Sequence, residues 1–202
     1  MKFNSKYKQL TESLLIYDPT FLLTTYCKLT KDQFTVLPNK SVNIHTNITI
    51  PEELIQNGKL LIKFNKIDGD FYCYSNQLTS LLGAPTTTNG NFICYNNQLT
   101  SLQHAPTTIN GDFYCYSNKL TSLQHAPTTI NGDFICSHNQ LTSLQHAPTT
   151  IGGFFICSNN QLTSLQHAPT TVDGDFSCSN NKIKFTVKNV KSISKVKGDI
   201  YV

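Results

Sequence analysis

The chain of 202 residues contains no arginine and no tryptophan, and it has a single methionine. All sixteen basic residues are lysine. The planar guanidinium group is the usual means of reading bases and clamping phosphates, so its absence argues against a nucleic-acid partner. No apolar run approaches the roughly 18 residues of a membrane-spanning helix. The sequence therefore predicts no membrane partner either.

The sequence also predicts no export signal. The first apolar cluster, Leu14–Ile16, is too short to be the hydrophobic core of a signal peptide. The seven cysteines are an odd number, which does not fit a complete disulfide framework. We therefore expect reduced thiols and a cytoplasmic location.

Charge is scarce and unevenly placed. Charged residues make up 14% of the chain, against about 25% in an average globular domain. Residues 1–66 carry nine lysines and five acidic residues, a net +4. Residues 67–181 carry one lysine and six aspartates, a net −5, and residues 182–202 carry six lysines and one aspartate, a net +5. Asn, Thr, Ser and Gln are abundant in place of charged residues. This composition favours a fold in which polar side chains repeatedly hydrogen-bond the backbone.

A period of 21 residues dominates the middle of the chain. A fixed period of this size is the signature of a stacked solenoid. The recurring positions are Phe71, Phe92, Phe113, Phe134, Phe155 and Phe176; Cys73, Cys94, Cys115, Cys136, Cys157 and Cys178; Asn76, Asn97, Asn118, Asn139, Asn160 and Asn181; and the leucine pairs that begin with Leu78 and Leu81.

Each unit reads Phe-x-Cys-x-x-Asn-x-Leu, which matches the core L-x-L-x-x-N-x-L of a leucine-rich repeat with Phe and Cys at the strand leucines. The chain thus resembles the leucine-rich-repeat family, in the short repeats of bacterial and bacteriophage proteins. The resemblance covers about residues 66–182. It implies an α/β solenoid: a curved superhelix with a parallel β-sheet on its concave face and a mostly extended, loop-rich convex side. It also implies a binding scaffold and, for a phage-encoded chain, a location in the host cytoplasm.

Strand alternation assigns each residue of the unit a direction. Phe71 and Cys73 are expected to point into the core, and Tyr72 and Tyr74 to point outward. The amide of Asn76 lies where the chain leaves the strand, and it is expected to bond backbone groups of the neighbouring coil. Repetition of that contact would build a ladder of asparagines along the stack.

The ends of the repeat region depart from the period. We expect an N-terminal α/β cap over residues 1–65, the solenoid over 66–182, and a degenerate final repeat or C-terminal cap over 183–202. Within the first range the pattern predicts a helix over Lys8–Ile16 ended by Asp18 and Pro19, a strand over 42–50, a short helix over 51–58 and a strand over 60–64. Residues 196–202 echo the start of a repeat and predict a closing strand.

The outward positions of the strands form the candidate binding face. An aromatic and apolar patch on an exposed face is typical of an interaction site, and tyrosine is a preferred contact residue. The face comprises Tyr72, Tyr74, Ile93, Tyr95, Tyr114, Tyr116, Ile135 and His138, with a polar rim of Asp70, Asp112, Asp133 and Lys119. The alternative interpretation is that aromatic and β-branched residues merely suit strands.

Two further columns invite a metal or redox interpretation. Zinc needs about four ligands that converge, whereas the six periodic cysteines run along the stack axis, so we expect them to pack in the core. A column of His104, His125, His146 and His167 has no carboxylate recurring beside it, and duplication of the repeat explains it. The sequence predicts neither a metal nor a cofactor.

Catalytic motifs are absent, and the non-repeat segments are short for an independent catalytic domain. The sequence therefore predicts no enzyme and no small-molecule substrate. The leading hypothesis is a protein-protein interaction module, a bacterial or phage factor that binds and blocks a host protein. The alternatives are a structural spacer of a phage particle or cell surface, and a carbohydrate-binding repeat protein in which tyrosine rings stack on sugars.

Overall fold

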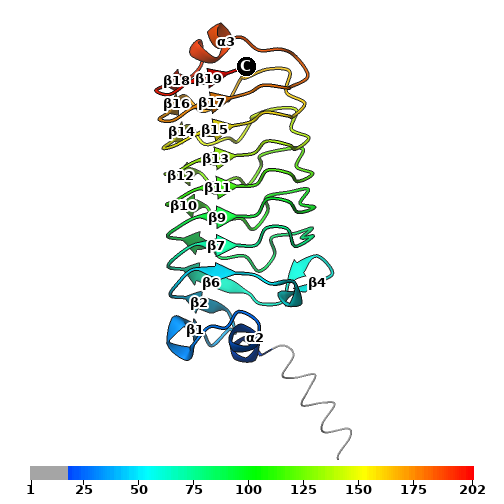
Figure 1. Cartoon of the computed structure of the whole chain (residues 1–202), viewed down its shortest axis with the longest axis vertical. Helices are drawn as coiled ribbons and strands as arrows, with labels where there is room; N and C mark the ends of the chain where they lie inside the picture. The colour runs from blue at the N-terminus through cyan, green and yellow to red at the C-terminus, as the bar shows by residue number, and fades with distance from the viewer. Residues whose placement is uncertain (1–17) are drawn as a thin grey trace, which may run out of the picture.

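The structure is a computed structural model that describes residues 18–202. The chain forms a parallel β-solenoid, in which coils of 21 residues stack along the long axis (Figure 1). Each coil of the repeat region contributes one strand to each of two sheets, called sheet A and sheet B. Their strand orders are β1-β2-β6-β8-β10-β12-β14-β16-β18 and β19-β17-β15-β13-β11-β9-β7-β3.

The strands of the two sheets are short, and most hold two residues. Sheet A contains β1 (Phe34–Val36), β2 (Val42–Ile44), β6 (Phe64–Ile67), β8 (Thr87–Thr88), β10 (Thr108–Ile109), β12 (Thr129–Ile130), β14 (Thr150–Ile151), β16 (Thr171–Val172) and β18 (Lys195–Val196). Sheet B contains β3 (Ile48–Thr49), β7 (Phe71–Tyr72), β9 (Phe92–Ile93), β11 (Phe113–Tyr114), β13 (Phe134–Ile135), β15 (Phe155–Ile156), β17 (Phe176–Ser177) and β19 (Ile200–Tyr201). All pairs within the two sheets are parallel except β1 with β2.

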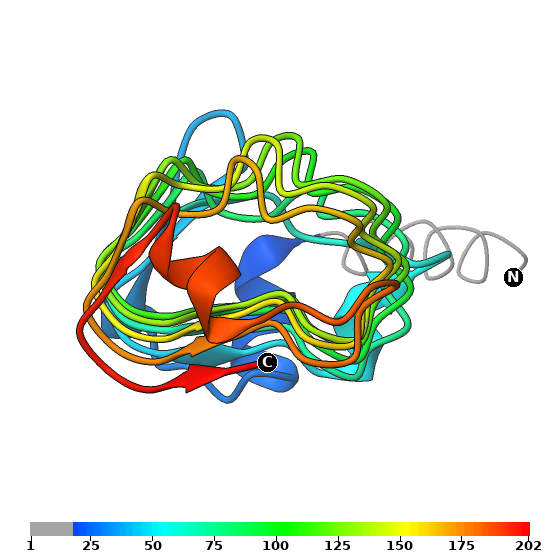
Figure 2. The same cartoon turned by 90° about the horizontal axis from the view of Figure 1, so that it is seen from above.

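The second parallel sheet refines the expectation of a mostly extended, loop-rich convex side: the return segment is extended, and part of it pairs as strands. After each Ala-Pro, a Thr-Ile or similar pair adopts strand geometry and pairs in register with the same pair one coil away, as Thr108 does with Thr129. Proline pushes the residue before it toward extended backbone, and β-branched residues suit a pleated surface. The coils overlie one another in the end-on view, so sheet B presents a nearly straight face rather than a concave one (Figure 2).

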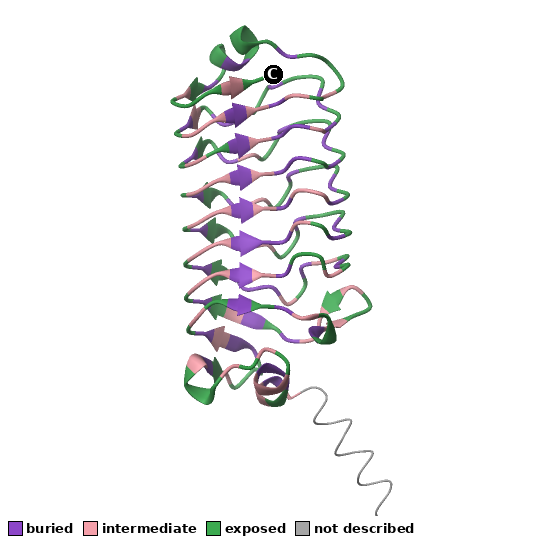
Figure 3. Cartoon of the chain, viewed as in Figure 1, coloured by how far each residue is buried: buried purple, intermediate pink, exposed green. Residues whose placement is uncertain are grey.

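The core lies between the two sheets and repeats with the coils. The six phenylalanines and six cysteines of the period are buried, as are both leucine columns and the inward Ile or Val of sheet A. The phenylalanine rings follow one another along the axis with centroids 5.1 to 5.9 Å apart between β7 and β17. Figure 3 shows buried residues recurring at the same place in every coil. The side chains that point inward are therefore those that the alternation predicts.

The expected asparagine ladder is confirmed by its hydrogen bonds. Asn139 Nδ2 donates to the carbonyl of Cys115 in the preceding coil (3.0 Å) and to that of Cys136 in its own coil (3.1 Å). Its Oδ1 accepts from the backbone N–H of Leu120 (3.0 Å). One buried amide thus satisfies backbone groups of two coils that the strands do not pair. The same pattern recurs at Asn97, Asn118 and Asn160.

A second ladder lies at the corner where the chain passes from sheet A to sheet B. Asp112 Oδ1 accepts from the N–H of Asp133 one coil later (2.8 Å), and Asn91 Oδ1 accepts from Asp112 N in the same way (2.7 Å). The glycine before each of these residues leaves room for that side chain. A Cβ on Gly132 would overlap Asp112 Oδ1 and lie 2.8 Å from the carbonyl carbon of Gly111. Either Asp or Asn serves the ladder, because only Oδ1 is needed.

The N-terminal segment differs from the predicted elements. The helix expected over 8–16 lies outside the described residues, and Asp18 and Pro19, expected to end a helix, begin α2 (Pro19–Thr25), with Asp18 as its N-cap (3.0 Å to Thr20 N). A carboxylate before a proline suits the first turn of a helix, where the missing N–H has no cost.

The range 42–50, read as one strand, holds both β2 and β3, which belong to different sheets. Both lie within the range expected to be a cap, and they pair with β6 and β7 of the first coils. The same segment holds two 3-10 turns and a hairpin: η1 (Lys31–Gln33) precedes β1, and η2 (Glu52–Leu54) follows β3 and precedes the hairpin of β4 (Ile55–Gln56) and β5 (Lys59–Leu60). Residues 51–58 therefore form a 3-10 turn and half a hairpin instead of the expected helix.

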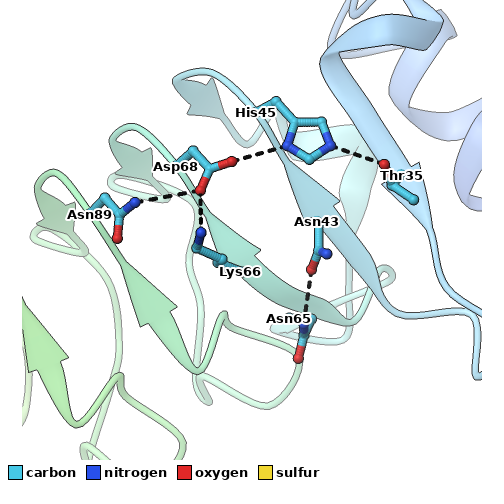
Figure 4. A network of polar contacts seen from close by, with 7 residues as sticks. All are labelled: Thr35, Asn43, His45, Asn65, Lys66, Asp68 and Asn89. Carbon is cyan, nitrogen blue, oxygen red and sulfur yellow. Dashed lines mark hydrogen bonds and ion pairs between the residues drawn. The ribbon is translucent and has the colours of Figure 1, made fainter.

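A polar network joins the first coils on the outside of sheet A (Figure 4). Asp68 pairs with Lys66 Nζ (2.7 Å) and His45 Nδ1 (3.0 Å), and the His45 ring reaches Thr35 Oγ1 (2.9 Å). Hydrogen bonds from Lys66 and then His45 lower the pKa of the Asp68 carboxyl. These groups are well exposed, so the network orients side chains and contributes little to stability.

The C-terminal end matches the predicted closing strand. β19 pairs in parallel with β17, with Ile200 opposite Phe176, and β18 pairs with β16. Between β17 and β18 lies the short helix α3 (Val187–Lys191), which crosses the end of the stack in Figure 2. Val190 of this helix is buried, as is Phe185 before it, so apolar side chains cover the last coil.

Replacing Asn139 by Ala should lower the free energy of unfolding by about 2–5 kcal/mol. The change leaves a buried N–H of Leu120 and the carbonyl of Cys115 without a partner, and each such group costs about 1–3 kcal/mol. Urea denaturation measures the loss. Gln140→Ala, at the exposed neighbouring position, is the control and should change stability by no more than about 0.5 kcal/mol. Equal losses in the two variants would contradict the ladder's role.

Candidate binding face

The outer surface of sheet B carries two neighbouring columns of side chains. The first column reads Tyr72, Ile93, Tyr114, Ile135, Ile156 and Ser177, and the second reads Tyr74, Tyr95, Tyr116, Ser137, Ser158 and Ser179. Strand pairing puts successive members of the first column opposite one another, as Tyr114 is opposite Ile93 and Ile135. The parallel register therefore brings together the tyrosines that the sequence predicted on one face.

The second column begins with a stack of three tyrosine rings, here called the tyrosine stack. The centroids of Tyr74 and Tyr95 lie 4.9 Å apart with 5° between their planes, and those of Tyr95 and Tyr116 lie 4.5 Å apart with 7° between theirs. Each ring covers the face of its neighbour, so the stack presents ring edges and hydroxyls at the surface. Tyr74 is the most exposed of the three, at 37%.

Carboxylates hold the tyrosines of the first column. Tyr72 Oη donates to Asp70 Oδ2 (2.7 Å), and Tyr114 Oη lies within reach of Asp112 Oδ2 (3.1 Å) and Asp133 Oδ2 (3.2 Å). Because one phenol has one proton, two carboxylates share it. The bond to Asp70 raises the pKa of Tyr72, while burial and then the two aspartates raise the pKa of Tyr114. Both tyrosines are neutral donors with fixed orientations at neutral pH.

The surface changes where serine replaces tyrosine. Ser137 and Ser158 are buried although they occupy the positions of the tyrosine stack, because their side chains are too short to rise above the sheet. Ser158 Oγ contacts Ser177 Oγ (2.7 Å) and Ser179 Oγ (3.2 Å). The aromatic half of the face, from the coil of Tyr72 to the coil of Tyr116, is thus raised above a hydroxyl-lined half.

The remaining predicted residues lie at different depths and places. Ile93 is only 5% exposed, because the tyrosines on either side cover it. It therefore packs beneath the face and contributes little accessible surface. Ile135 is partly exposed in the centre of the first column. His138 and Lys119 are exposed where their coils leave sheet B, and they bond the side chains of Asn159 (3.2 Å) and Gln98 (3.3 Å).

Phe154 is a surface residue that the sequence reasoning missed. It occupies the corner position that Asp or Asn holds in most other coils, and 43% of it is exposed. Its outward neighbour on the same strand run is Ile156, which is partly exposed. The sequence does mark this residue, because one repeat reads Gly-Phe-Phe where others read Gly-Asp-Phe. Phe154 extends the apolar surface of sheet B into the half of the face that lacks tyrosine.

The aspartates of the face have no ion-pair partners among the described residues. Within residues 18–202, the ion pairs join Asp68 to His45 and Lys66, and Asp173 to Lys197. Those three contacts lie along the sheet A side of the coils. Asp112, Asp133 and Asp175 therefore carry uncompensated negative charge beside the apolar columns.

The cysteine column packs as the sequence predicts for its position. All seven cysteines are free, and the six periodic ones are buried. Burial raises the pKa of Cys136 to about 12 and that of Cys178 to about 11. Residues 18–202 contain no group of three His, Cys, Asp or Glu side chains arranged to hold a metal ion.

The histidine column has a backbone explanation. His104, His125, His146 and His167 each adopt the left-handed conformation, with φ between 66° and 73°. Each lies within a turn that the N–H of the following alanine closes onto a leucine carbonyl, as Ala126 does onto Leu123 (2.9 Å). The first coil has Gly83 at this position, with φ 95°. The turn thus requires a positive φ, and the imidazoles are exposed at its tip.

Raising the pH above about 9 should destabilise the fold. Unfolded thiols ionise near pH 9.0, whereas buried Cys136 keeps its proton until about pH 12. The folded state then binds more protons, so stability falls as pH rises through this window, by up to about 1.4 kcal/mol per pH unit for each thiol. Urea midpoints at pH 8 and 10 measure the change.

Cys136→Ala is the variant that isolates a thiol in this experiment. It should be less stable at pH 8 but should lose less stability than the wild type between pH 8 and 10. Iodoacetamide labelling at pH 8 should leave the six column cysteines unmodified until urea unfolds the chain. Rapid labelling of the folded protein would contradict the buried column.

Among the described residues, no helix combines the length and the apolar character that crossing a membrane requires. Comparison of the whole chain with protein-family models, with curated proteins and with solved structures finds no match.

Proposed function

We propose that this protein is a non-enzymatic protein-protein interaction module whose binding face is the outer surface of sheet B. The observation that carries the proposal is the tyrosine stack beside the column of Tyr72, Tyr114, Ile135 and Ile156. Large amphipathic side chains held on a rigid sheet are typical of surfaces that bind proteins.

The geometry of the tyrosines lowers the cost of binding. Stacking at 4.5 to 4.9 Å and hydrogen bonds to Asp70, Asp112 and Asp133 already restrict the side chains in the free protein. A partner then has less side-chain entropy to remove when it docks. The hydroxyls at the outer edge provide donors and acceptors without a buried charge.

The stacking also favours a protein over a carbohydrate partner. A sugar that stacks on tyrosine needs an open ring face, and within the stack both faces of Tyr95 are covered by neighbouring rings. Ring edges and hydroxyls suit the mixed polar and apolar surface of a protein. The carbohydrate hypothesis and the spacer hypothesis become outcomes of the test below.

The proposal includes the family and setting that the repeat suggests. The asparagine ladder and the Phe-x-Cys-x-x-Asn-x-Leu unit support membership of the leucine-rich-repeat class, in a form with sheets on two sides. In that setting the protein is a bacterial or phage factor that binds and blocks a host protein in the cytoplasm. It uses no cofactor, membrane or nucleic acid.

Replacing Tyr74, Tyr95 and Tyr116 together by Ser should abolish capture of a protein partner. The fold tolerates serine at these positions, because Ser137, Ser158 and Ser179 occupy them in later coils. The matched control replaces Thr108, Thr129 and Thr150 by Ser on sheet A. Pull-down from lysates identifies the partner, and calorimetry with the purified partner should show at least about a 100-fold loss of affinity for the tyrosine variant alone.

Three outcomes would contradict the proposal. If both variants bind the partner as well as the wild type does, the contact lies away from sheet B. If the threonine variant alone loses binding, the face is sheet A. If no protein is captured while glycans raise the melting temperature of the wild type, the carbohydrate hypothesis gains, and without either result the spacer hypothesis does.

A further inference from the structure

Phe154 stands at the corner position where other coils have an Asp or Asn whose Oδ1 bonds the next coil. In other coils Oδ1 of the corner residue accepts from the next N–H, as Asp112 does from Asp133 (2.8 Å) and Asp175 does from Asp199 (2.9 Å). Phenylalanine has no acceptor, so no side chain of the preceding coil bonds the N–H of Asp175. The substitution therefore removes a stabilising contact and places a large apolar ring in water.

The backbone at Phe154 nevertheless keeps its place in the stack. Its N–H donates to Asp133 Oδ1 (2.7 Å), and its carbonyl accepts from Phe134 N (2.7 Å). The ring leans toward the next coil, since a Cβ added to Gly174 would overlap Phe154 Cδ1. The backbone of Phe154 is thus bonded to Asp133 of the preceding coil, and its exposed ring lies beside Gly174 of the next coil.

The charges around the ring have one sign. Asp133 and Asp175 have no ion-pair partner among the described residues, and Asp133 shares the Tyr114 hydroxyl proton with Asp112. Asp112 and Asp133, and likewise Asp175 and Asp199, lie one coil apart, at about 4.8 Å, and repel each other, whereas Asp133 and Asp175 lie two coils apart, at about 9.6 Å, on either side of the ring. A cation that docks beside them would relieve this repulsion, whereas an anion would increase it.

A small metal ion does not fit this arrangement. Oδ1 of both Asp112 and Asp133 accepts a backbone hydrogen bond from the next coil, and Oδ2 of both accepts from Tyr114. A divalent ion would have to displace these bonds to gather several oxygens. A side-chain cation needs only one free lone pair on each carboxylate, and its aliphatic stem can pack on a ring.

We propose that the sheet B face binds a basic, extended segment of a protein partner, with Phe154 as an apolar anchor. Lysine or arginine stems lie against Phe154 and Ile156, and their charged groups contact Asp133 and Asp175. Four coil steps separate Tyr74 from the coil of Phe154, about 19 Å, which an extended segment of about six residues spans. This inference rests on the proposed function, and it specifies the chemistry of the partner.

The ladder supplies variants that separate binding from stability. Phe154→Asn restores the missing acceptor without adding charge, because Asn91 Oδ1 already serves this ladder (2.7 Å to Asp112 N). Asp175→Asn keeps the acceptor for Asp199 N and removes one charge. The matched control is Asp173→Asn, which makes the same change on the sheet A side, where Asp173 pairs with Lys197 (2.8 Å).

The test uses fluorescein-labelled six-residue peptides and the full chain. One peptide alternates Arg and Leu, a second alternates Glu and Leu, and a third alternates Gln and Leu. In fluorescence anisotropy the wild type should bind the arginine peptide at least about tenfold more tightly than either other peptide in about 0.1 M salt, and the preference should shrink in about 1 M salt. Phe154→Asn should weaken that binding about tenfold and raise the urea midpoint. Asp175→Asn should weaken it about threefold at an unchanged midpoint, and Asp173→Asn should leave it unchanged.

Two results would overturn the inference: equal affinity for the three peptides, or wild-type affinity in both Phe154→Asn and Asp175→Asn. The same variants assayed with the captured partner distinguish the two proposals. Loss of the partner in the tyrosine-to-serine variant alone, with no salt dependence, refutes the basic segment and keeps the interaction module. Retention of the partner in every sheet B variant refutes both.

Discussion

The hydrogen bonds between one coil and the next, made by buried side chains, are the constraint on which the rest of this structure depends. A two-residue strand pairs too few backbone groups to hold a coil in register. The amide of Asn139 and its equivalents close that gap by bonding two carbonyls and an N–H across two coils. At the corner, Oδ1 of Asp112 and its equivalents accepts one backbone N–H from the next coil. Together with the strands of sheets A and B, these bonds hold successive coils in register, except that the corner bond is missing between the coils of Phe154 and Asp175.

That fixed register determines what the surface can do. Inward positions must repeat, because each Phe, Cys and Leu packs against its copy in the neighbouring coil. Outward positions carry no such requirement, and they are where the coils differ: tyrosine becomes serine along one column, and aspartate becomes phenylalanine at one corner. A solenoid thus separates the residues that specify the fold from those that specify contacts. The contrast between an invariant interior and a graded outer face supports binding as the role of sheet B.

The sequence predicted the period, the core and the outer face, and it did so through one physical rule. Alternation along a strand assigns Phe71 inward and Tyr72 outward, and a register of whole repeats then aligns Tyr74, Tyr95 and Tyr116. The sequence predicted an extended return segment but not its pairing into sheet A, because Thr108–Ile109 is too short to show alternation. Helix α2 escaped because Asp18 and Pro19 suit either side of a helix boundary, and only the structure shows on which side the helix lies. The near-burial of Ile93 depends on the size of the tyrosines beside it, which a pattern of single residues does not contain.

Phe154 was missed because the period describes what the repeats share and not where one repeat differs. A consensus of the repeat ignores single departures from it. At the corner, however, the side chain accepts a backbone N–H of the next coil, which phenylalanine cannot do. Local rules broken without a compensating contact in the fold are concentrated at functional positions. Here the loss falls on the same face as the tyrosine stack, beside carboxylates that nothing in residues 18–202 neutralises. The apolar ring and the unpaired charges each cost stability in the free protein, and a basic segment on sheet B would remove both costs at once.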